Sequence, residues 1–290
     1  MTAVLRAQGL GKRYGRRWAL SECTLDIPAG RVVGLVGPNG AGKTTLLSLA
    51  AGLLTPTSGT IEVCGGRPAD GAAQLAKVGF VAQDTPVYAR LTVAEHLELG
   101  ARLSPGWDPR LARDRIRRLG LPPGGRAGAL SGGQRAQLAL TLALAKRPRL
   151  LILDEPVASL DPLARREFLQ DLSEATATRD LGVVHSSHLV SDLERVCDHL
   201  IVLVASRVRL AGEVAELLAA HRTLTATRID PAALPPGVRV VSVHRTDART
   251  TMLVRADADV HDPAWKVGAP SLEDLVLAYM SAPEAPEAGR

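Results

Sequence analysis

The residues of this chain best suited to chemistry lie in one glycine-rich stretch near the N-terminus. Residues 37–45 read GPNGAGKTT and fit the phosphate-loop pattern G-x-x-x-x-G-K-[ST] without a substitution. Glycines let backbone N–H groups surround a phosphate chain, and a helix N-terminus adds partial positive charge. Lys43 would place a full charge on the terminal phosphates, and Thr44 would offer a hydroxyl to Mg²⁺. The stretch consists of Gly37, Pro38, Asn39, Gly40, Ala41, Gly42, Lys43, Thr44 and Thr45.

A second candidate is a pair of acids at the end of an apolar run. Residues 150–153 are aliphatic and lead directly into Asp154 and Glu155, so they predict a buried parallel strand. Ligands bind at the carboxyl ends of such strands, where adjacent carboxylates are costly unless a metal or a reaction needs them. This disfavours the alternative of a solvated acidic turn. We predict that Asp154 belongs to the Mg²⁺ shell and that Glu155 orients and deprotonates an attacking water.

Each of the other candidates, taken alone, also has a purely structural explanation. Tyr14 could stack on an adenine ring or simply lie at the surface, and Gln83 follows an apolar run at 78–82. Residues 131–134, Ser-Gly-Gly-Gln, could bind an anion at a helix start or merely cap that helix. His185 continues a strand and is expected to be a packing or surface residue, whereas His188 lies at a strand-to-helix turn.

The elements that must position these residues are short and alternate between strand and helix. Residues 31–36 predict the strand before the glycine loop and residues 46–52 the helix after it, which disfavours a chance match to the motif. Residues 1–30 are expected to form short strands and turns. Further strands are predicted at 60–63, 78–82, 150–154, 181–184 and 200–204. Helices are predicted at 92–103, 111–119 and 135–146, from 162 onward, and around 189–196.

Beyond about residue 213 the chemical motifs end, so we place the domain boundary there. Residues 1–213 are predicted to form the main domain, with a helical part at about 84–147, and residues 214–290 a small α+β domain. Strands are expected at 223–229, 238–244 and 251–256, and a helix with Leu272, Leu275, Val276 and Tyr279 along one stripe. The tail from Pro283 is expected to be disordered.

Composition excludes several classes of protein. The chain has 290 residues, 46% of them hydrophobic and only 3% aromatic, so an aliphatic core is expected. Its three cysteines are far apart, which predicts no disulfide or cysteine-held metal, and no apolar run is long enough to span a membrane. The net charge is +5, but without interleaved aromatics no nucleic-acid partner is expected. The densest basic run is expected to be a solvated helix face: Arg110, Arg113, Arg115, Arg117 and Arg118.

Together these motifs resemble the ATP-binding cassette (ABC) ATPases over about residues 4–215. The discriminating element is the pentapeptide Leu-Ser-Gly-Gly-Gln at 130–134, just ahead of the acidic strand. One departure is Ala205-Ser206-Arg207, where the family usually has a glycine turn. The matching elements stand in the family's order: Tyr14, residues 37–45, Gln83, residues 130–134, residues 151–155, residues 159–161 and His188.

The resemblance implies an α/β fold: a P-loop NTPase (RecA-like) core sheet with an antiparallel β subdomain, a helical signature subdomain and the C-terminal α+β appendage. It also implies that two chains pack head to tail as a homodimer with two ATP molecules and Mg²⁺ between them. Tyr14 would stack on adenine, and Thr44, Gln83 and Asp154 would serve the metal. The residues expected from one chain are residues 37–45, Gln83, Asp154, Glu155 and His188, and those from its partner are Ser131, Gly132, Gly133, Gln134 and Asp161.

Three functions are compatible with these motifs. The favoured one is the ATPase subunit of a transporter, peripheral on the cytoplasmic face of the membrane, driving a separate permease that docks near Pro86, Val87 and Tyr88. Export is favoured because residues 271–279 are similar to the end of cassettes in two-component export systems. A soluble ABC ATPase of DNA repair or translation is the alternative, although only 46 residues separate Gln83 from Leu130. Another phosphate-loop NTPase or kinase is the third.

Overall fold

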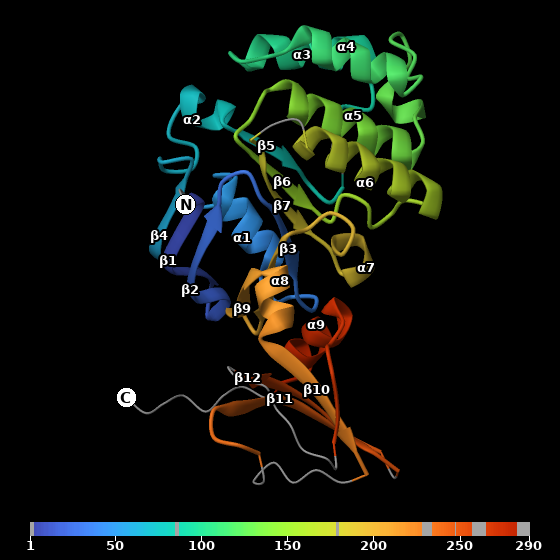
Figure 1. Ribbon diagram of the computed structural model, residues 1–290. Coiled ribbons are helices and arrows are strands. Elements are labelled where there is room, and N and C mark those ends of the chain that lie inside the picture. Colours follow the sequence, from blue (N-terminus) through green and yellow to red (C-terminus); the bar gives the residue numbers. More distant parts are fainter. Residues whose placement is uncertain are drawn as a thin grey trace.

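The computed structural model describes residues 3–84, 87–177, 180–227, 234–246, 248–256 and 265–282. Within these ranges the strands form three sheets, with helices on both faces of the largest (Figure 1). The tail predicted to be disordered, the end of the strand predicted at 223–229, and Pro86 all lie outside the described residues.

The N-terminal sheet has the order β2-β1-β4 and is antiparallel. Its strands are β1 (Ala3–Tyr14), β2 (Arg17–Pro28) and β4 (Ser58–Val63). The expectation of short strands and turns over residues 1–30 was wrong, because β1 and β2 each run for 12 residues. Bulges shift their register between Ala7 and Lys12, and each shift breaks the two-residue alternation that a strand shows in sequence.

The largest sheet of the described residues has the order β5-β6-β7-β3-β8-β9. Its first five strands are parallel, and only β9 runs antiparallel to its neighbour β8. Every residue of β3, β6 and β7 is buried, as expected for strands covered on both faces. The strands are β3 (Val32–Val36), β5 (Val78–Val81), β6 (Leu150–Asp154), β7 (Gly182–Ser186), β8 (His199–Val204) and β9 (Arg207–Glu213).

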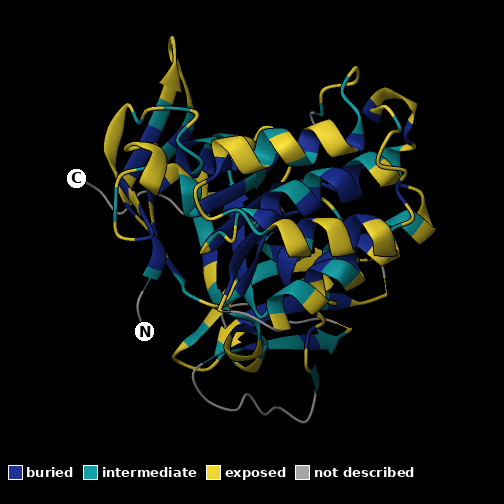
Figure 2. Ribbon diagram, turned by 90° about the horizontal axis from the view of Figure 1, so that it is seen from above, coloured by how far each residue is buried: buried dark blue, intermediate teal, exposed yellow. Residues whose placement is uncertain are grey.

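Two apolar layers hold this sheet between helices, and the buried residues concentrate along its strands (Figure 2). One layer packs against α1 (Lys43–Ala50) and the N-terminal sheet, and includes Ile152 and Val184. The other packs against α5 (Gly132–Ala145) and α6 (Pro162–Ala177), and includes Leu151 and Val183. Because the parallel strands point the same way, the loops after β3, β5, β6 and β7 meet at one edge.

The helical part between β5 and β6 contains α3 (Val93–Leu103), α4 (Pro109–Arg118), the 3-10 turn η1 (Ala127–Ala129) and α5. The basic run on α4 was expected to face solvent, and this was wrong for Arg115. Its side chain is 9% exposed and donates to Asp171 of α6 at 3.0 Å. It also donates to Thr141 and Gln137 of α5, at 3.3 Å each, so it joins three helices.

The C-terminal part adds a separate sheet and a helix that returns to the core. The order of the sheet is β11-β12-β10-β13, formed by β10 (His221–Ala226), β11 (Val238–Arg245), β12 (Thr250–Ala256) and β13 (Lys266–Gly268). The helix α9 (Leu272–Ser281) packs back on β8 and α7, a feature that the sequence did not predict.

Several short elements also escaped prediction or were misplaced. They are α2 (Ala72–Ala76), β9, α8 (Val214–Ala219) and β13. The helix expected over 189–196 is only α7 (Val190–Leu193). The helix expected to start at Arg135 starts at Gly132, because Ser131 caps it. No helix of the described part is both long and apolar enough to cross a bilayer.

Candidate functional site

The glycine loop joins β3 to α1 in a geometry that only glycine permits. Gly42 caps α1 with a φ of 106°, and a Cβ there would overlap the carbonyl oxygen of Ala19. A Cβ at Gly37 would overlap the carbonyl oxygen of Leu203. The loop therefore packs tightly against the strands beneath it. The start of α1 leaves backbone N–H groups without intrahelical partners, and such groups can bind an anion.

Lys43 is held at the centre of this loop although it carries a charge. Its side chain is only 6% exposed, and Nζ donates to the carbonyl oxygen of Gly37 at 2.8 Å. Nζ also lies 3.5 Å from Oε1 of Glu155, which is 13% exposed. A buried cation with these partners is positioned to meet an anion that enters the loop.

The two acids after β6 have different environments. Asp154 is 2% exposed, and its Oδ1 accepts a hydrogen bond from Ser186 Oγ at 2.8 Å. Ser186 Oγ also accepts the backbone N–H of Glu155 at 2.8 Å. Glu155 has a φ of 45°, in the left-handed region, which turns the chain so that its carboxylate reaches both Lys43 and His188. His188 Nδ1 lies 3.3 Å from Glu155 Oε2.

Lys43, Glu155 and His188 line one cavity of about 760 Å³ at the carboxyl edge of the sheet. Residues far apart in the sequence meet there, namely Tyr14, the glycine loop, Gln83, Glu155 and His188. Tyr14 ends β1 rather than lying in a turn. The residue is 52% exposed, and Lys12 Nζ lies 5.6 Å from the centroid of its ring. Asp154 does not line the cavity and lies beneath it, against Ser186.

The Ser-Gly-Gly-Gln stretch lies outside that cavity. Ser131 caps α5, since its Oγ accepts the N–H of Gln134 while the Gln134 side chain accepts the N–H of Ser131. Asp161 caps α6 by accepting two backbone N–H groups at 3.0 and 3.1 Å. The two helix starts are adjacent, because a Cβ on Gly133 would lie 2.8 Å from that of Ala164.

Comparison with known proteins identifies the family. A family model described as ABC transporter matches residues 20–158. The uncharacterized ABC transporter ATP-binding protein YxlF of Bacillus subtilis (strain 168) is 35% identical over 226 residues, which cover 76% of this chain and 74% of that protein. The chain belongs to the ABC transporter family. It is an ATP-binding subunit and an ATPase, as its motifs predicted.

Other ABC relatives differ in what their names say they transport. The molybdenum import protein ModC of Aromatoleum aromaticum is 35% identical, over 75% of this chain and 60% of that protein. The bacitracin transport protein BcrA of Enterococcus faecalis is 29% identical, over 85% of this chain and 81% of that protein. A solved structure of the ATP binding subunit of an ABC transporter matches with a TM-score of 0.67 at 30% identity, covering 74% of this chain and 92% of that one. This match confirms the predicted fold class.

In an ABC ATPase the described geometry can bind a nucleotide and hold a water for attack. The loop amides and Lys43 supply positive charge, and the Glu155 carboxylate beside His188 can accept a proton. Two residues of this region were missed in the sequence. Ser186 links Asp154 to the backbone of Glu155, and its only sequence signal is a polar residue ending a buried strand. Arg17 lines the cavity opposite Tyr14 in the β1–β2 hairpin.

Proposed function

We propose that this ABC ATPase hydrolyses ATP with the residues gathered in the 760 Å³ cavity and drives a separate membrane permease, in the direction of export. The convergence of Tyr14, the glycine loop, Gln83, Glu155 and His188 on one cavity carries the proposal. Tyr14 stacks on adenine, Lys43 holds the terminal phosphates, Glu155 polarises the attacking water, and His188 contacts the γ-phosphate.

The residues around the cavity also suit Mg²⁺. The described residues contain no cluster of three histidine, cysteine or acidic ligands, as a self-sufficient metal site would need. Mg²⁺ is instead held in nucleotide sites by one or two carboxylates, by the phosphates and by water. We assign this role to Thr44, Gln83 and Asp154, which offer a hydroxyl, an amide and a carboxylate oxygen. Bound Mg²⁺ would neutralise charge on the phosphates.

A second copy of the chain completes the proposed site. The starts of α5 and α6 lie side by side and are exposed at Ser131 and Asp161, outside the cavity of their own chain. Two neighbouring helix N-termini favour an anion. We assign Ser131, Gly132, Gly133, Gln134 and Asp161 to the ATP bound by the partner chain, so that ATP joins two copies and hydrolysis releases them.

An apolar hollow between the core and the helical part is the proposed docking surface for the permease. It has a volume of about 810 Å³ and runs from α1 and β5 to α3 and α5. Ten large apolar side chains are exposed among the described residues, and four of them line this hollow: Leu53, Leu75, Tyr88 and Leu103. Exposed apolar patches of this kind mark interaction surfaces. The hollow includes Tyr88, near which the sequence predicts that the permease docks.

Export is the finer part of the proposal. It is supported by the 36% identity to the Nod factor export ATP-binding protein I of Cupriavidus metallidurans, over 75% of this chain and 74% of that protein, and by the similarity of residues 271–279 to the end of export cassettes. We propose that residues 1–213 form the ATPase domain, with its helical part at about 84–147, and that residues 214–290 form an appendage. We also propose that the subunit lies on the cytoplasmic face of the membrane. The alternative function in DNA repair or translation is disfavoured, because α3 and α4 have only 11 and 10 residues and are too short to form coiled-coil arms.

The substitution Glu155→Gln tests the assigned chemistry. It removes the proton acceptor and one negative charge 3.5 Å from Lys43, while keeping the size of the side chain. We expect turnover to fall by on the order of 10²-fold or more, since acid–base assistance is lost. ATP binding should persist or tighten, and ATP should convert the variant to a dimer. Phosphate release measures the first effect, and gel filtration with and without Mg·ATP measures the second.

Glu62→Gln, on the exposed face of β4, is the matched control and should change neither measurement. Turnover of the Glu155 variant near that of the wild type would overturn the role of Glu155. A variant that binds ATP and stays monomeric would contradict the shared site but not the catalytic assignment.

A further inference from the structure

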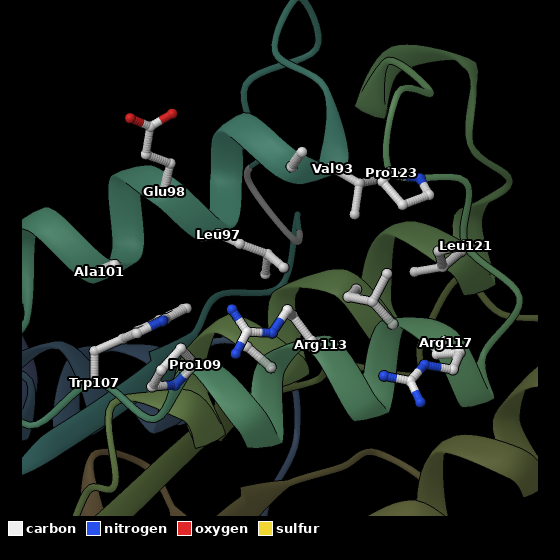
Figure 3. Close-up of a pocket in the computed structure, with 13 residues that line it drawn as sticks. Val93, Leu97, Glu98, Ala101, Trp107, Pro109, Arg113, Arg117, Leu121 and Pro123 are labelled. Atoms are coloured by element: carbon white, nitrogen blue, oxygen red, sulfur yellow. The ribbon is translucent and has the colours of Figure 1, made fainter.

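A second cavity lies in the helical part, between α3 and α4 (Figure 3). Its volume is about 640 Å³, within the range of roughly 300–1,000 Å³ that small-molecule sites occupy. The floor is fully apolar, since Val93, Ala112, Ile116 and Leu121 are each at most 3% exposed. Leu97, Trp107, Pro109 and Pro123 form the walls. None of the residues assigned to the nucleotide lines it.

The charged groups at its rim are mostly basic. Glu98 is engaged by Arg102 on the same helix, and Arg117 is paired with Asp114 at 3.2 Å, both at the surface. Arg113 is different, because no hydrogen bond or ion pair links its side chain to any other residue of the described ranges. Figure 3 shows its side chain extending between the two helices toward Trp107. A guanidinium with free donors therefore stands over an apolar floor.

We propose that this cavity binds a small amphipathic organic anion, with an apolar or aromatic body on the floor and a carboxylate, sulfate or sulfonate group on Arg113. The apolar floor selects the body, because burying it against Ile116 and Leu121 removes both surfaces from water. Arg113 selects the charge, since a guanidinium binds planar oxyanions through paired N–H donors. A cationic ligand would be repelled by Arg113 and Arg117 together.

The position of the cavity connects it to the rest of the subunit. Trp107 lines this cavity and also the apolar hollow proposed for the permease, and its ring packs on Gly100, where a Cβ would lie 2.5 Å from it. Val93, Ile116 and Leu121 belong to the same apolar cluster as Leu130, the residue before the cap of α5. A ligand on the floor would therefore touch residues that support both the docking hollow and the Ser-Gly-Gly-Gln loop.

The test uses two fluorescent probes on the full chain with saturating ADP, which keeps them out of the nucleotide cavity. One is 8-anilinonaphthalene-1-sulfonate, an aromatic anion, and the other is N-phenyl-1-naphthylamine, the same body without the sulfonate. We expect the wild type to bind the sulfonate saturably, with energy transfer from Trp107. Arg113→Ala should weaken sulfonate binding by about tenfold, the loss of one charge-assisted contact, and leave the neutral probe unaffected.

Two further variants make the result specific. Ala101→Phe places a ring at the exposed edge of the cavity and should weaken both probes. Arg110→Ala removes an exposed arginine from the same helix, at a different hollow, and should weaken neither. Each variant must first bind ADP with wild-type affinity, which shows that it is folded. If Arg113→Ala fails this requirement, Arg113→Gln replaces it.

Three outcomes would overturn the proposal. The first is that the wild type shows no saturable sulfonate binding, or that Arg113→Ala and Arg110→Ala weaken sulfonate binding equally. The second is unchanged binding in Ala101→Phe. The third concerns membranes: if vesicles of phosphatidylglycerol, but not phosphatidylcholine, sediment the protein through Arg113 while the soluble sulfonate does not bind, the arginines serve a membrane surface and not this cavity.

Discussion

At the scale of single residues, the site depends on a backbone conformation that ordinary side chains avoid. Glu155 has a φ of 45°, which costs a non-glycine residue about 1–2 kcal/mol. The hydrogen bond from its N–H to Ser186, and the bond from Ser186 to Asp154, hold that conformation in place. Strain maintained by surrounding contacts in this way is typical of functional sites. A serine on the neighbouring strand thus holds the backbone of Glu155, the residue that we propose orients the water.

A buried histidine one residue before Ser186 has no such partners. His185 is completely buried between Gly34 of β3 and Leu153 of β6, and neither ring nitrogen has a hydrogen-bond partner among the described residues. The sequence predicts a packing or surface residue at this position, and the structure shows a packing residue. Burial lowers the pKa of His185 from 6.5 to about 4, because the charged ring cannot be solvated there.

We predict that His185 makes the protein less stable in mild acid. The unfolded chain binds a proton near pH 6.5 and the folded chain only near pH 4, so stability falls as the pH drops through this window. From pH 8 to pH 5 the loss should be about 2 kcal/mol. His185→Leu should remove that part of the loss, which urea unfolding at the two pH values measures.

The matched control for this prediction is His244→Gln, at an exposed position of β11. It should leave the pH dependence of unfolding unchanged. If His185→Leu loses as much stability as the wild type between pH 8 and pH 5, then His185 is not the group responsible.

At the scale of elements, the last helix connects the C-terminal part to the ATPase core. Ser271 and Asp274 form a capping box that starts α9. Leu275 and Val276 are at most 1% exposed and lie in one apolar cluster with Val36, Leu200 and Val202 of the central sheet. The helix therefore buries part of the face of β8.

We predict that Leu275→Ala destabilises the ATPase core, although the residue lies outside every nucleotide motif. Removing a fully buried leucine should lower the free energy of unfolding by about 3 kcal/mol. The measurement is urea unfolding followed by tryptophan fluorescence in a Trp265→Phe background. Only Trp18 and Trp107 then report, and both lie within residues 1–213.

Leu277→Ala, 54% exposed on the same helix, should change the unfolding free energy by less than about 0.5 kcal/mol. An unchanged fluorescence midpoint for Leu275→Ala would mean that residues 1–213 unfold independently of α9.

At the scale of the whole molecule, we predict that the subunit no longer binds the proposed permease when a charged side chain is introduced into the apolar hollow. Leu103 is 73% exposed and lines the hollow, so Leu103→Asp should leave the fold intact. A carboxylate desolvated in the interface should reduce the fraction that co-sediments with membranes by about tenfold or more. ATP hydrolysis by the purified subunit should not change.

The control is Leu277→Asp, at an exposed position of α9 that is far from the hollow in sequence. This variant should still co-sediment with membranes. Equal co-sedimentation of the two variants would show that the hollow is not the docking surface.

The sequence alone determined the parts of the site that consecutive residues build. The glycine loop, the acids after an aliphatic strand and the capped start of α5 are each specified within a few residues, because the geometry of a loop or a helix end is local. The α/β fold class was implied by the resemblance to the ABC ATPases, and the alternation of strand and helix segments agrees with it. Boundaries were less well predicted where bulges or short elements obscured the periodicity, as in β1, β9 and α8.

Only the tertiary structure decided which distant residues meet. The strand order β5-β6-β7-β3-β8-β9 brings Gln83, Glu155 and His188 to the cavity that Lys43 lines, and no local pattern contains that order. The same holds for α9 on β8, for Arg115 buried among three helices and for the cavity beside Arg113. Side chains at long sequence separation are brought together by the packing of whole layers, and the free energy of that packing is shared among many residues rather than written in any one motif.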